Sequence, residues 1–233
     1  MLQVRPSNER GRNQLDWLNS RFTFSFDRYY DPKHMGFGDL RVLNEDWIAP
    51  RGGFPMHPHR DMEIVTYILE GSLAHEDSMG NGSVIEAGKV QRMTAGTGIY
   101  HSEFNPSGTE TARLLQIWIL PREKGLTPGY EERAIHGDGS GGGIRLAASP
   151  QGRDGSVTIQ QDLDLFAGRL PAGGEFRHEL DSGAKAWLQV AGGEVDLNET
   201  SLLPGDGVGI RDERELVIQA SKDAEILLFD MRV

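Results

Sequence analysis

Apolar residues in this chain fall in many short runs separated by glycine and turn-forming residues. Few windows repeat apolar residues at helical spacing, and runs of roughly four to eight residues are typical of strands in β-sandwiches and β-barrels. The clearest strands are expected at 41–48, 63–69, 114–120, 185–190, 215–219 and 225–229. Only one short helix, near 14–18, is compatible with the pattern. The pattern therefore predicts an all-β fold.

The stretch at 121–143 interrupts this pattern. It holds charged residues, Pro128 and the run Gly137-Asp-Gly-Ser-Gly-Gly-Gly143, a composition typical of a connector. The stretch divides the chain into halves of similar length. We expect an N-terminal domain at 1–130, a Gly-rich connector at 131–143 and a C-terminal domain at 144–233.

The two halves share a faint repeat. His57 precedes Gly71 by the same number of residues that separates His178 from Gly192, and a strand pattern lies between the members of each pair. Duplication of one barrel unit explains this match. In that alignment Leu180 replaces the second histidine of the first half, so the second unit is expected to bind no metal.

Composition narrows the function classes. The chain has 233 residues, with 24 Lys+Arg against 35 Asp+Glu and a formal net charge of -11, which opposes direct binding to a nucleic-acid backbone. It has no cysteine, so histidine and carboxylate side chains are the strong metal ligands that remain. The first residues lack the apolar segment of a secretion signal, and no run of about 18 apolar residues follows. We expect a cytoplasmic protein with no membrane or direct nucleic-acid partner.

Candidate chemistry begins with His57-Pro-His59. Because side chains alternate along a strand, histidines at positions i and i+2 point to one face, as two ligands of one metal ion require. His101-Ser-Glu103 repeats this spacing with an imidazole and a carboxylate. Two such pairs on neighbouring strands would supply four ligands and leave a position open for water, dioxygen or a chelating substrate. These residues predict a metal centre in the first half.

The same motifs belong to a longer block that carries a family resemblance. It reads Phe54-Pro-Met-His57-Pro-His59-Arg-Asp-Met-Glu63-Ile-Val-Thr-Tyr-Ile-Leu-Glu-Gly71, followed by Gly88, Gly96 and His101-Ser-Glu103-Phe-Asn105. The block resembles the pirin family of bicupins, and in particular its bacterial quercetin 2,3-dioxygenases. The resemblance implies two cupin-type β-barrels (double-stranded β-helices) in tandem.

The resemblance also implies a site and an activity. It assigns His57, His59, His101 and Glu103 as metal ligands in the N-terminal barrel. The expected ion is iron(II), although the same donors also accept zinc, manganese, cobalt, nickel or copper. The implied reaction is cleavage of the heterocyclic ring of flavonols such as quercetin by O2. Glu103 would also accept the substrate's hydroxyl proton, as a catalytic base.

Two positions depart from the general cupin pattern. Glu63 stands close to where cupins place their carboxylate ligand, and parity in a regular strand puts it on the same face as His57 and His59. The pattern leaves open whether Glu63 binds the metal or orients a ligand. Thr94 occupies a position that usually holds proline, so the loop before His101 is expected to be reshaped.

Other function classes remain open. Eukaryotic pirins resemble nuclear cofactors, so the alternative is a metal-bearing, redox-sensing interaction protein with a protein partner and no physiological catalysis. A cupin isomerase would keep zinc and need a cationic cluster, for which Arg60 and Arg92 are the candidates. The remaining histidines have no partner at ligand spacing and are expected to be surface or core residues: His34, His75, His136 and His178.

Overall fold

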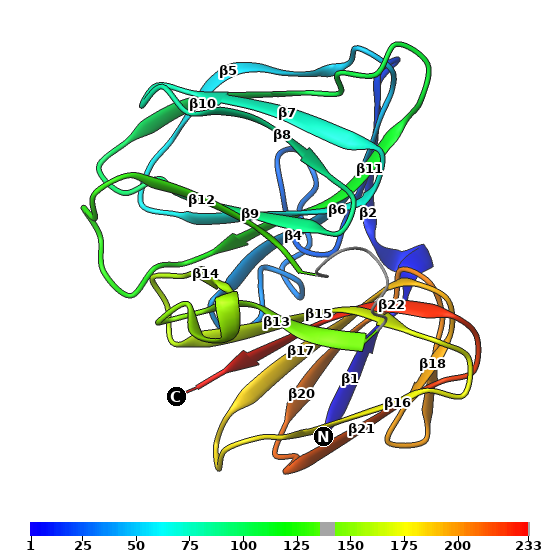
Figure 1. Cartoon of the computed structure of the whole chain (residues 1–233). Helices are drawn as coiled ribbons and strands as arrows, with labels where there is room; N and C mark the ends of the chain where they lie inside the picture. The colour runs from blue at the N-terminus through cyan, green and yellow to red at the C-terminus, as the bar shows by residue number, and fades with distance from the viewer. Residues whose placement is uncertain (136–142, 233) are drawn as a thin grey trace. The chain divides into compact units, whose positions relative to one another are not determined.

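The chain forms two compact units in a computed structural model, which describes residues 1–135 and 143–232 (Figure 1). The N-terminal unit comprises Gly11–Ala134 and Val157–Gln161. The C-terminal unit comprises Met1–Arg10, Ile135–Ser156 and Asp162–Val233. Within the described ranges, no helix is long and apolar enough to cross a membrane.

The N-terminal unit is built from β-strands. They are β2 (Gly11–Gln14), β3 (Leu18–Phe22), β4 (Leu40–Ile48), β5 (Gly53–His59), β6 (Glu63–Glu70), β7 (Ser72–Asp77), β8 (Gly82–Glu86), β9 (Lys89–Thr94), β10 (Ile99–Phe104), β11 (Ala112–Ile119), β12 (Gly129–Ala134) and β14 (Val157–Thr158). The larger sheet has the order β12-β9-β6-β11-β4-β3-β2, and the smaller sheet has the order β5-β10-β7-β8.

The C-terminal unit is also built mainly from strands. They are β1 (Leu2–Arg5), β13 (Gly143–Ser149), β15 (Leu163–Leu170), β16 (Glu175–Glu179), β17 (Lys185–Gly192), β18 (Val195–Leu197), β19 (Thr200–Leu202), β20 (Gly207–Arg211), β21 (Glu215–Ala220) and β22 (Ala224–Met231), with short 3-10 turns at Ser7–Glu9 and Arg153–Gly155. Its larger sheet contains the order β1-β20-β17-β22-β15-β13, and its smaller sheet has the order β16-β21-β18-β19. The six strands expected from the sequence correspond to β4, β6, β11, β17, β21 and β22, so the all-β prediction is confirmed.

The strand orders of the two units correspond. The order β12-β9-β6-β11-β4-β3 matches β1-β20-β17-β22-β15-β13, and β5-β10-β7-β8 matches β16-β21-β18-β19. His57 lies opposite His101 across β5 and β10, and His178 lies opposite Leu216 across β16 and β21. The faint sequence repeat therefore marks two barrels of one topology, as predicted.

The expected helix at 14–18 is absent from the structure. Gln14 ends β2, and Leu18 begins β3, where it is buried opposite Ile48 of β4. A tight turn joins the two strands, with hydrogen bonds between the backbones of Leu15 and Leu18. The prediction of a helix was wrong because pairing with β4 outweighs the local preference.

The two units also differ from the expected boundaries. Met1–Arg10, expected within 1–130, lie in the C-terminal unit because β1 pairs with β20. Residues 131–134 of the expected connector extend β12, which pairs with β9. Val157–Gln161, expected in the domain at 144–233, lie in the N-terminal unit. The rest of the expected connector at 136–142, including His136, lies outside the described residues.

Strand register builds the interior of the N-terminal unit in layers. Asn44 lies opposite Gln116, Gln116 opposite Thr66, and Thr66 opposite Gln91, on β4, β11, β6 and β9. Because cross-strand neighbours share a face, these side chains form one polar row. Two buried apolar clusters flank the row, one with Leu18, Ile48, Ile68, Leu73, Ile85, Ala112 and Leu114, the other with Ile64, Met93, Ala95 and Ile99.

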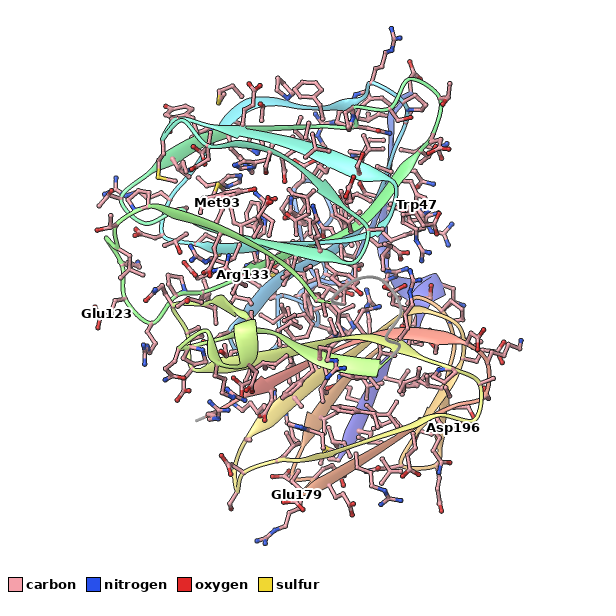
Figure 2. All side chains as sticks on the ribbon, in the orientation of Figure 1. Trp47, Met93, Glu123, Arg133, Glu179 and Asp196 are labelled. Atoms are coloured by element: carbon pink, nitrogen blue, oxygen red, sulfur yellow. The ribbon has the colours of Figure 1, made fainter. Side chains whose placement is uncertain are left out.

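Figure 2 shows a buried and an exposed side chain of this unit. Met93, at the inner face of β9, lies inside the unit, whereas Glu123 extends into solvent. The polar row of the larger sheet faces the smaller sheet, as the hydrogen bond from Gln116 to Glu103 of β10 shows. A polar layer is thus enclosed between two apolar ones.

The close approach of β5 and β10 leads to a stability prediction for Gly53→Ala. A Cβ at Gly53 would lie 2.3 Å from the backbone oxygen of Glu103 and 2.6 Å from Cα of Phe104. Since backbone atoms cannot move aside cheaply, we expect Gly53→Ala to lower the free energy of unfolding by about 1–3 kcal/mol. Urea denaturation measures this loss.

Gly82→Ala in β8 is the matched control. The nearest atom to a Cβ there is the backbone oxygen of His75 at 3.9 Å, so we expect a change within about 1 kcal/mol. Equal effects of the two substitutions would contradict the close packing of β5 on β10.

Candidate metal centre

Strands β5 and β10 bring three candidate histidines together. His57 lies directly opposite His101, and His59 lies opposite Ile99. β5 is an edge strand, so Pro55 and Pro58 are tolerated there although proline cannot donate a ladder hydrogen bond. The local sequence therefore allows the His-Pro-His motif to form a strand while both imidazoles face the interior.

The ring nitrogens of His57, His59 and His101 converge. One nitrogen of each ring lies within 4.8 Å of the others, and the Nε2 atoms of His57 and His101 are 2.9 Å apart. Because the carbonyl of Pro55 can only accept, Nδ1 of His57 carries the proton that it donates over 2.8 Å. The lone pair of His57 therefore lies on Nε2, toward His101.

Burial keeps the other two imidazoles neutral. It lowers the pKa of His59 to about 4, with a further lowering by His57. It lowers the pKa of His101 to about 2, with further lowering by the neighbouring histidines. A neutral imidazole is the form that binds a metal ion. His59 and His101 thus offer metal-binding nitrogens throughout the neutral pH range.

Glu103 is the carboxylate beside this cluster. It is 3% exposed, and its Oε2 lies 3.9 Å from Nε2 of His101. Gln116 donates through Nε2 to both carboxylate oxygens, at 3.1 and 3.0 Å, while its Oε1 accepts from Thr66 at 3.1 Å. The Thr66 contact fixes the orientation of the amide, so Gln116 holds the carboxylate toward the cluster. Burial raises the pKa of Glu103 to about 7 against the opposing effect of Gln116.

Glu63 lies elsewhere. It alternates along β6 with Ile64 of the inner apolar cluster, so its side chain points to the outer face of the larger sheet. There its Oε2 accepts from the backbone N–H of Gln160 at 3.1 Å, and a hydrogen bond with Thr94 is also present. The parity expected from a regular strand fails because β5 and β6 belong to different sheets.

His75 lies next to the cluster, although the sequence assigned it no role. Its ring centroid is 5.3 Å from that of His101, and it groups by distance with His101 and Glu103. Its Nε2–H donates to Asp77 at 3.2 Å, and its Nδ1 accepts from Gln91 at 2.9 Å. Both nitrogens are therefore engaged. The spacing His75-Glu-Asp77, the same as in His101-Ser-Glu103, is the signal that could have revealed it.

The other residues considered from the sequence have their own partners. His178 donates to Asp230 at 2.9 Å in the C-terminal unit, and His34 lies 4.0 Å from Asp31. Arg92 donates to the carbonyl of Thr158 at 2.6 Å and to Glu131 at 3.0 Å. Arg92 is therefore engaged in structural contacts and does not form a cationic cluster in the pocket.

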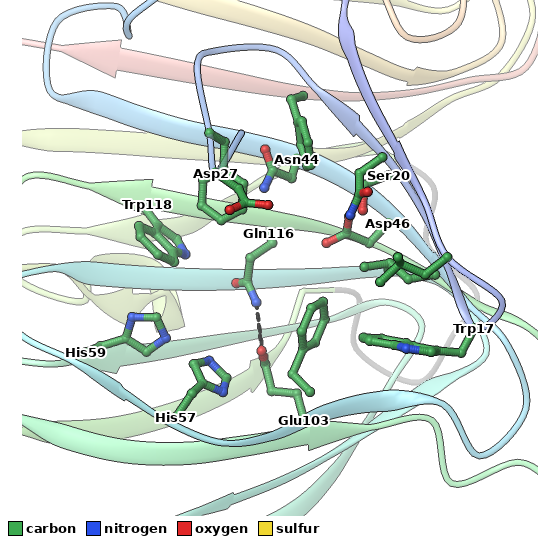
Figure 3. Close-up of a pocket in the computed structure, with 16 residues that line it drawn as sticks. Trp17, Ser20, Asp27, Asn44, Asp46, His57, His59, Glu103, Gln116 and Trp118 are labelled. Atoms are coloured by element: carbon green, nitrogen blue, oxygen red, sulfur yellow. Dashed lines mark hydrogen bonds between the residues drawn. The ribbon is translucent and has the colours of Figure 1, made fainter. Parts of the chain in front are cut away.

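A pocket of about 520 Å³ opens beside the cluster (Figure 3). Its apolar walls are formed by Leu15, Trp17, Leu18, Phe22, Phe26, Phe54 and Trp118. His57, His59 and Glu103 line one side, and Asn44, Asp46 and Gln116 lie across from them. The volume is within the range of small-molecule sites, and aromatic walls suit a flat ring. The pocket can therefore hold a flat aromatic molecule against the histidine cluster.

Comparison with known proteins establishes the family. Residues 3–119 match the family model described as Pirin, and residues 146–231 match the model of the quercetinase C-terminal cupin domain. The chain belongs to the pirin family. It is 47% identical over 231 residues to a protein of Escherichia coli (strain K12) named quercetin 2,3-dioxygenase, with 99% of each chain covered. It is 40% identical to a pirin-like protein of Caulobacter vibrioides, again with 99% of each chain covered.

One similar solved structure contains a metal ion. The bacterial pirin YhhW of Escherichia coli, in complex with nickel(II), matches this pirin with a TM-score of 0.94 and 46% identity over 99% of both chains. The residues of the present chain fit such an ion, because converging imidazole lone pairs and a buried carboxylate are donors that divalent metals satisfy. The findings support a divalent-metal-dependent cupin.

Asp46 in the pocket leads to a prediction about pH in the metal-free pirin. Burial, with the charge of Glu45 adding to it, raises the pKa of Asp46 from 3.8 to about 7, and a hydrogen bond with Ser20 opposes this rise. Between these pH values the folded carboxyl keeps a proton that the unfolded carboxyl has released. The contribution of the Asp46 carboxyl to the free energy of unfolding is therefore fully present below about pH 4. This contribution is lost as the pH rises toward about 7.

Asp46→Asn removes this pH dependence. Relative to the variant, the free energy of unfolding of the wild type should fall by roughly 2–4 kcal/mol between about pH 4 and pH 7.5. Urea denaturation across this range, with a chelator present, measures both proteins. The difference between them includes the part of the rise in the pKa of Glu103 that the charge of Asp46 causes. Parallel pH profiles would show that burial does not raise the pKa of Asp46.

Proposed function

We propose that this pirin is a metal-dependent dioxygenase that cleaves the heterocyclic ring of flavonols such as quercetin with O2. The observation that carries the proposal is the position of the histidine cluster in the wall of an aromatic-lined pocket. In the proposal, one divalent metal ion is held by His57, His59, His101 and Glu103. The name of the Escherichia coli relative supports the substrate class.

The donor set accepts several ions, and we propose iron(II) as the physiological one. Three imidazoles and a carboxylate also accept manganese, cobalt, nickel, copper and zinc, with affinities ordered mainly by the ion. Iron(II) can react with O2 because it is redox-active. Zinc has no redox chemistry and so cannot take this role. When bound, the ion would lower the pKa of a coordinated hydroxyl group and leave a coordination position open.

The residues of the chain would then bind the flavonol and move its proton. The 3-hydroxyl and 4-carbonyl groups would point toward the histidine cluster, with the rings between walls that include Phe54 and Trp118. Glu103 would accept the 3-hydroxyl proton on a carboxylate oxygen. Gln116 keeps that carboxylate oriented through its two hydrogen bonds. Addition of O2 and ring opening would yield a depside and carbon monoxide.

A metal-bearing interaction protein is the second candidate. The outer face of the smaller sheet, behind the histidines, carries exposed apolar side chains: Met56 at 52%, Val84 at 48%, Tyr100 at 54% and Phe104 at 38% exposed. Alternation along β5, β8 and β10 places these four side chains on one face. Exposed apolar patches of this kind mark protein interaction sites, so the metal state could bias a docking surface there.

The direct test is aerobic turnover of quercetin by protein reconstituted anaerobically with iron(II). We expect one metal ion per chain, loss of the visible absorbance of quercetin and release of carbon monoxide. His59→Ala and Glu103→Ala should each lower turnover by at least about 100-fold, because each removes a proposed ligand. Metal analysis, absorbance and carbon monoxide detection provide the measurements.

His178→Ala is the matched control, since His178 occupies the position of His57 in the other barrel. We expect it to keep both the metal and the turnover. Stoichiometric metal binding without turnover, for each of several metals, would contradict the dioxygenase and favour the interaction protein. Metal binding that survives His59→Ala would contradict the proposed ligands.

A further inference from the structure

Two buried acceptor atoms lie across the pocket from the proposed ligands. Asn44 is 3% exposed and Asp46 is 4% exposed, and both line the pocket from β4. Among the described residues, neither Oδ1 of Asn44 nor Oδ1 of Asp46 has a hydrogen-bond partner. Figure 3 shows both side chains on the side of the pocket opposite His57, His59 and Glu103.

The cross-strand neighbours of Asn44 cannot donate a hydrogen bond to its Oδ1. On one side lies Gln116, whose amide donates to Glu103 and whose carbonyl accepts from Thr66. On the other side, β3 places Phe22, which has no donor, opposite Asn44. The register of the sheet therefore leaves Oδ1 of this pocket-lining residue buried and without a donor.

Asp46 is in a similar position. Leu114 of β11 and Ser20 of β3 lie opposite it. The leucine has nothing to donate, and the hydrogen bond with Ser20 leaves Oδ1 without a partner. Both residues line the pocket, and each keeps one buried oxygen without a partner among the described residues.

Unpaired acceptors of this kind work against folding. A buried polar atom without a partner destabilises the folded protein relative to an apolar side chain of the same shape. Few such atoms occur in native structures, and those that do call for an explanation, such as a functional role. Oδ1 of Asn44 is an acceptor, and so is Oδ1 of Asp46 once its carboxyl is ionised, so a donor group would satisfy both atoms.

We infer that Asn44 and Asp46 are specificity-determining residues that accept hydrogen bonds from hydroxyl groups of a polyhydroxylated aromatic ligand. This inference rests on the proposed function, because it specifies the substrate class of the same pocket. A flat ligand would place its chelating edge at the histidine cluster and a ring hydroxyl at Asn44 and Asp46. Aromatic walls alone would accept any flat ring, whereas the acceptor pair selects the hydroxylated ones.

The test compares two flavonols that share the chelating edge. Quercetin carries additional ring hydroxyl groups, and 3-hydroxyflavone lacks them. Each is titrated anaerobically into full-length protein loaded with zinc(II), so that binding is measured without turnover. Wild type should bind quercetin at least about tenfold more tightly than 3-hydroxyflavone. Absorbance or fluorescence changes of the flavonol report the dissociation constants.

Asn44→Leu and Asp46→Leu keep the side-chain shape and remove the acceptor. Each should weaken quercetin binding by about 5- to 10-fold and leave 3-hydroxyflavone binding unchanged. Asn19→Leu is the matched control. Asn19 alternates with buried Leu18 and Ser20 on β3 and so faces away from the pocket. Binding of both flavonols by this variant should equal that of wild type.

The unfolding temperature of the Asn44→Leu variant distinguishes a ligand-binding role of Asn44 from a structural one. Asn44→Leu should unfold at the same temperature as wild type or higher, because it removes an unpaired buried acceptor. A lowered unfolding temperature with an intact preference for quercetin would assign Asn44 a structural role and overturn the inference. Equal weakening of both flavonols, or a wild type without preference, would overturn it as well.

The outcome is independent of catalysis. If the zinc-loaded protein shows the expected preference but the iron-loaded protein does not turn quercetin over, the dioxygenase fails and the hydroxyl-binding role of Asn44 and Asp46 stands. If turnover is normal and Asn44→Leu keeps the full preference for quercetin, the inference fails and the dioxygenase stands.

Discussion

A layer of hydrogen-bonding side chains is enclosed in the N-terminal barrel between two apolar layers, and each group in it must find a partner inside the barrel. Two amides of the larger sheet meet part of this demand by reaching the smaller sheet, Gln116 to Glu103 and Gln91 to His75. Among the described residues, the Oδ1 atoms of Asn44 and Asp46 have no such partner, and ring nitrogens of His57, His59 and His101 converge on one another. A metal ion and a hydroxylated ligand are the chemical groups that would complete them.

The C-terminal barrel shows what the same topology does without this constraint. Leu216 takes the register position of His101, facing His178 on the paired strand. It belongs to a continuous buried apolar cluster with Ile218, Leu188 and Ile226. The interior around Leu216 is therefore apolar, and among the described residues its half-buried histidine, His178, pairs with Asp230, whose Oδ1 has no partner. The chemistry of this pirin comes from a few side chains placed on a fold that both units share.

The sequence predicted the features that depend on local spacing. The i, i+2 pattern placed His57 with His59, and His101 with Glu103, on interior faces, and the apolar runs located the main strands. Features that depend on register between distant strands were not accessible. The possible role of Asn44 and Asp46 depends on their cross-strand neighbours on β11, Gln116 and Leu114. The local sequence around each residue does not indicate these pairings. For the same reason parity misplaced Glu63, since β6 belongs to another sheet than β5.

We propose that His57, His59, His101 and Glu103 hold one metal ion. Anomalous diffraction from crystals of the iron(II)-loaded protein, recorded on both sides of the iron absorption edge, tests it most directly. We expect one iron peak per chain, at about 2.0–2.3 Å from a nitrogen of each histidine and an oxygen of Glu103. A peak bound to His75 or Glu63, or no peak in protein that carries stoichiometric iron, would contradict it.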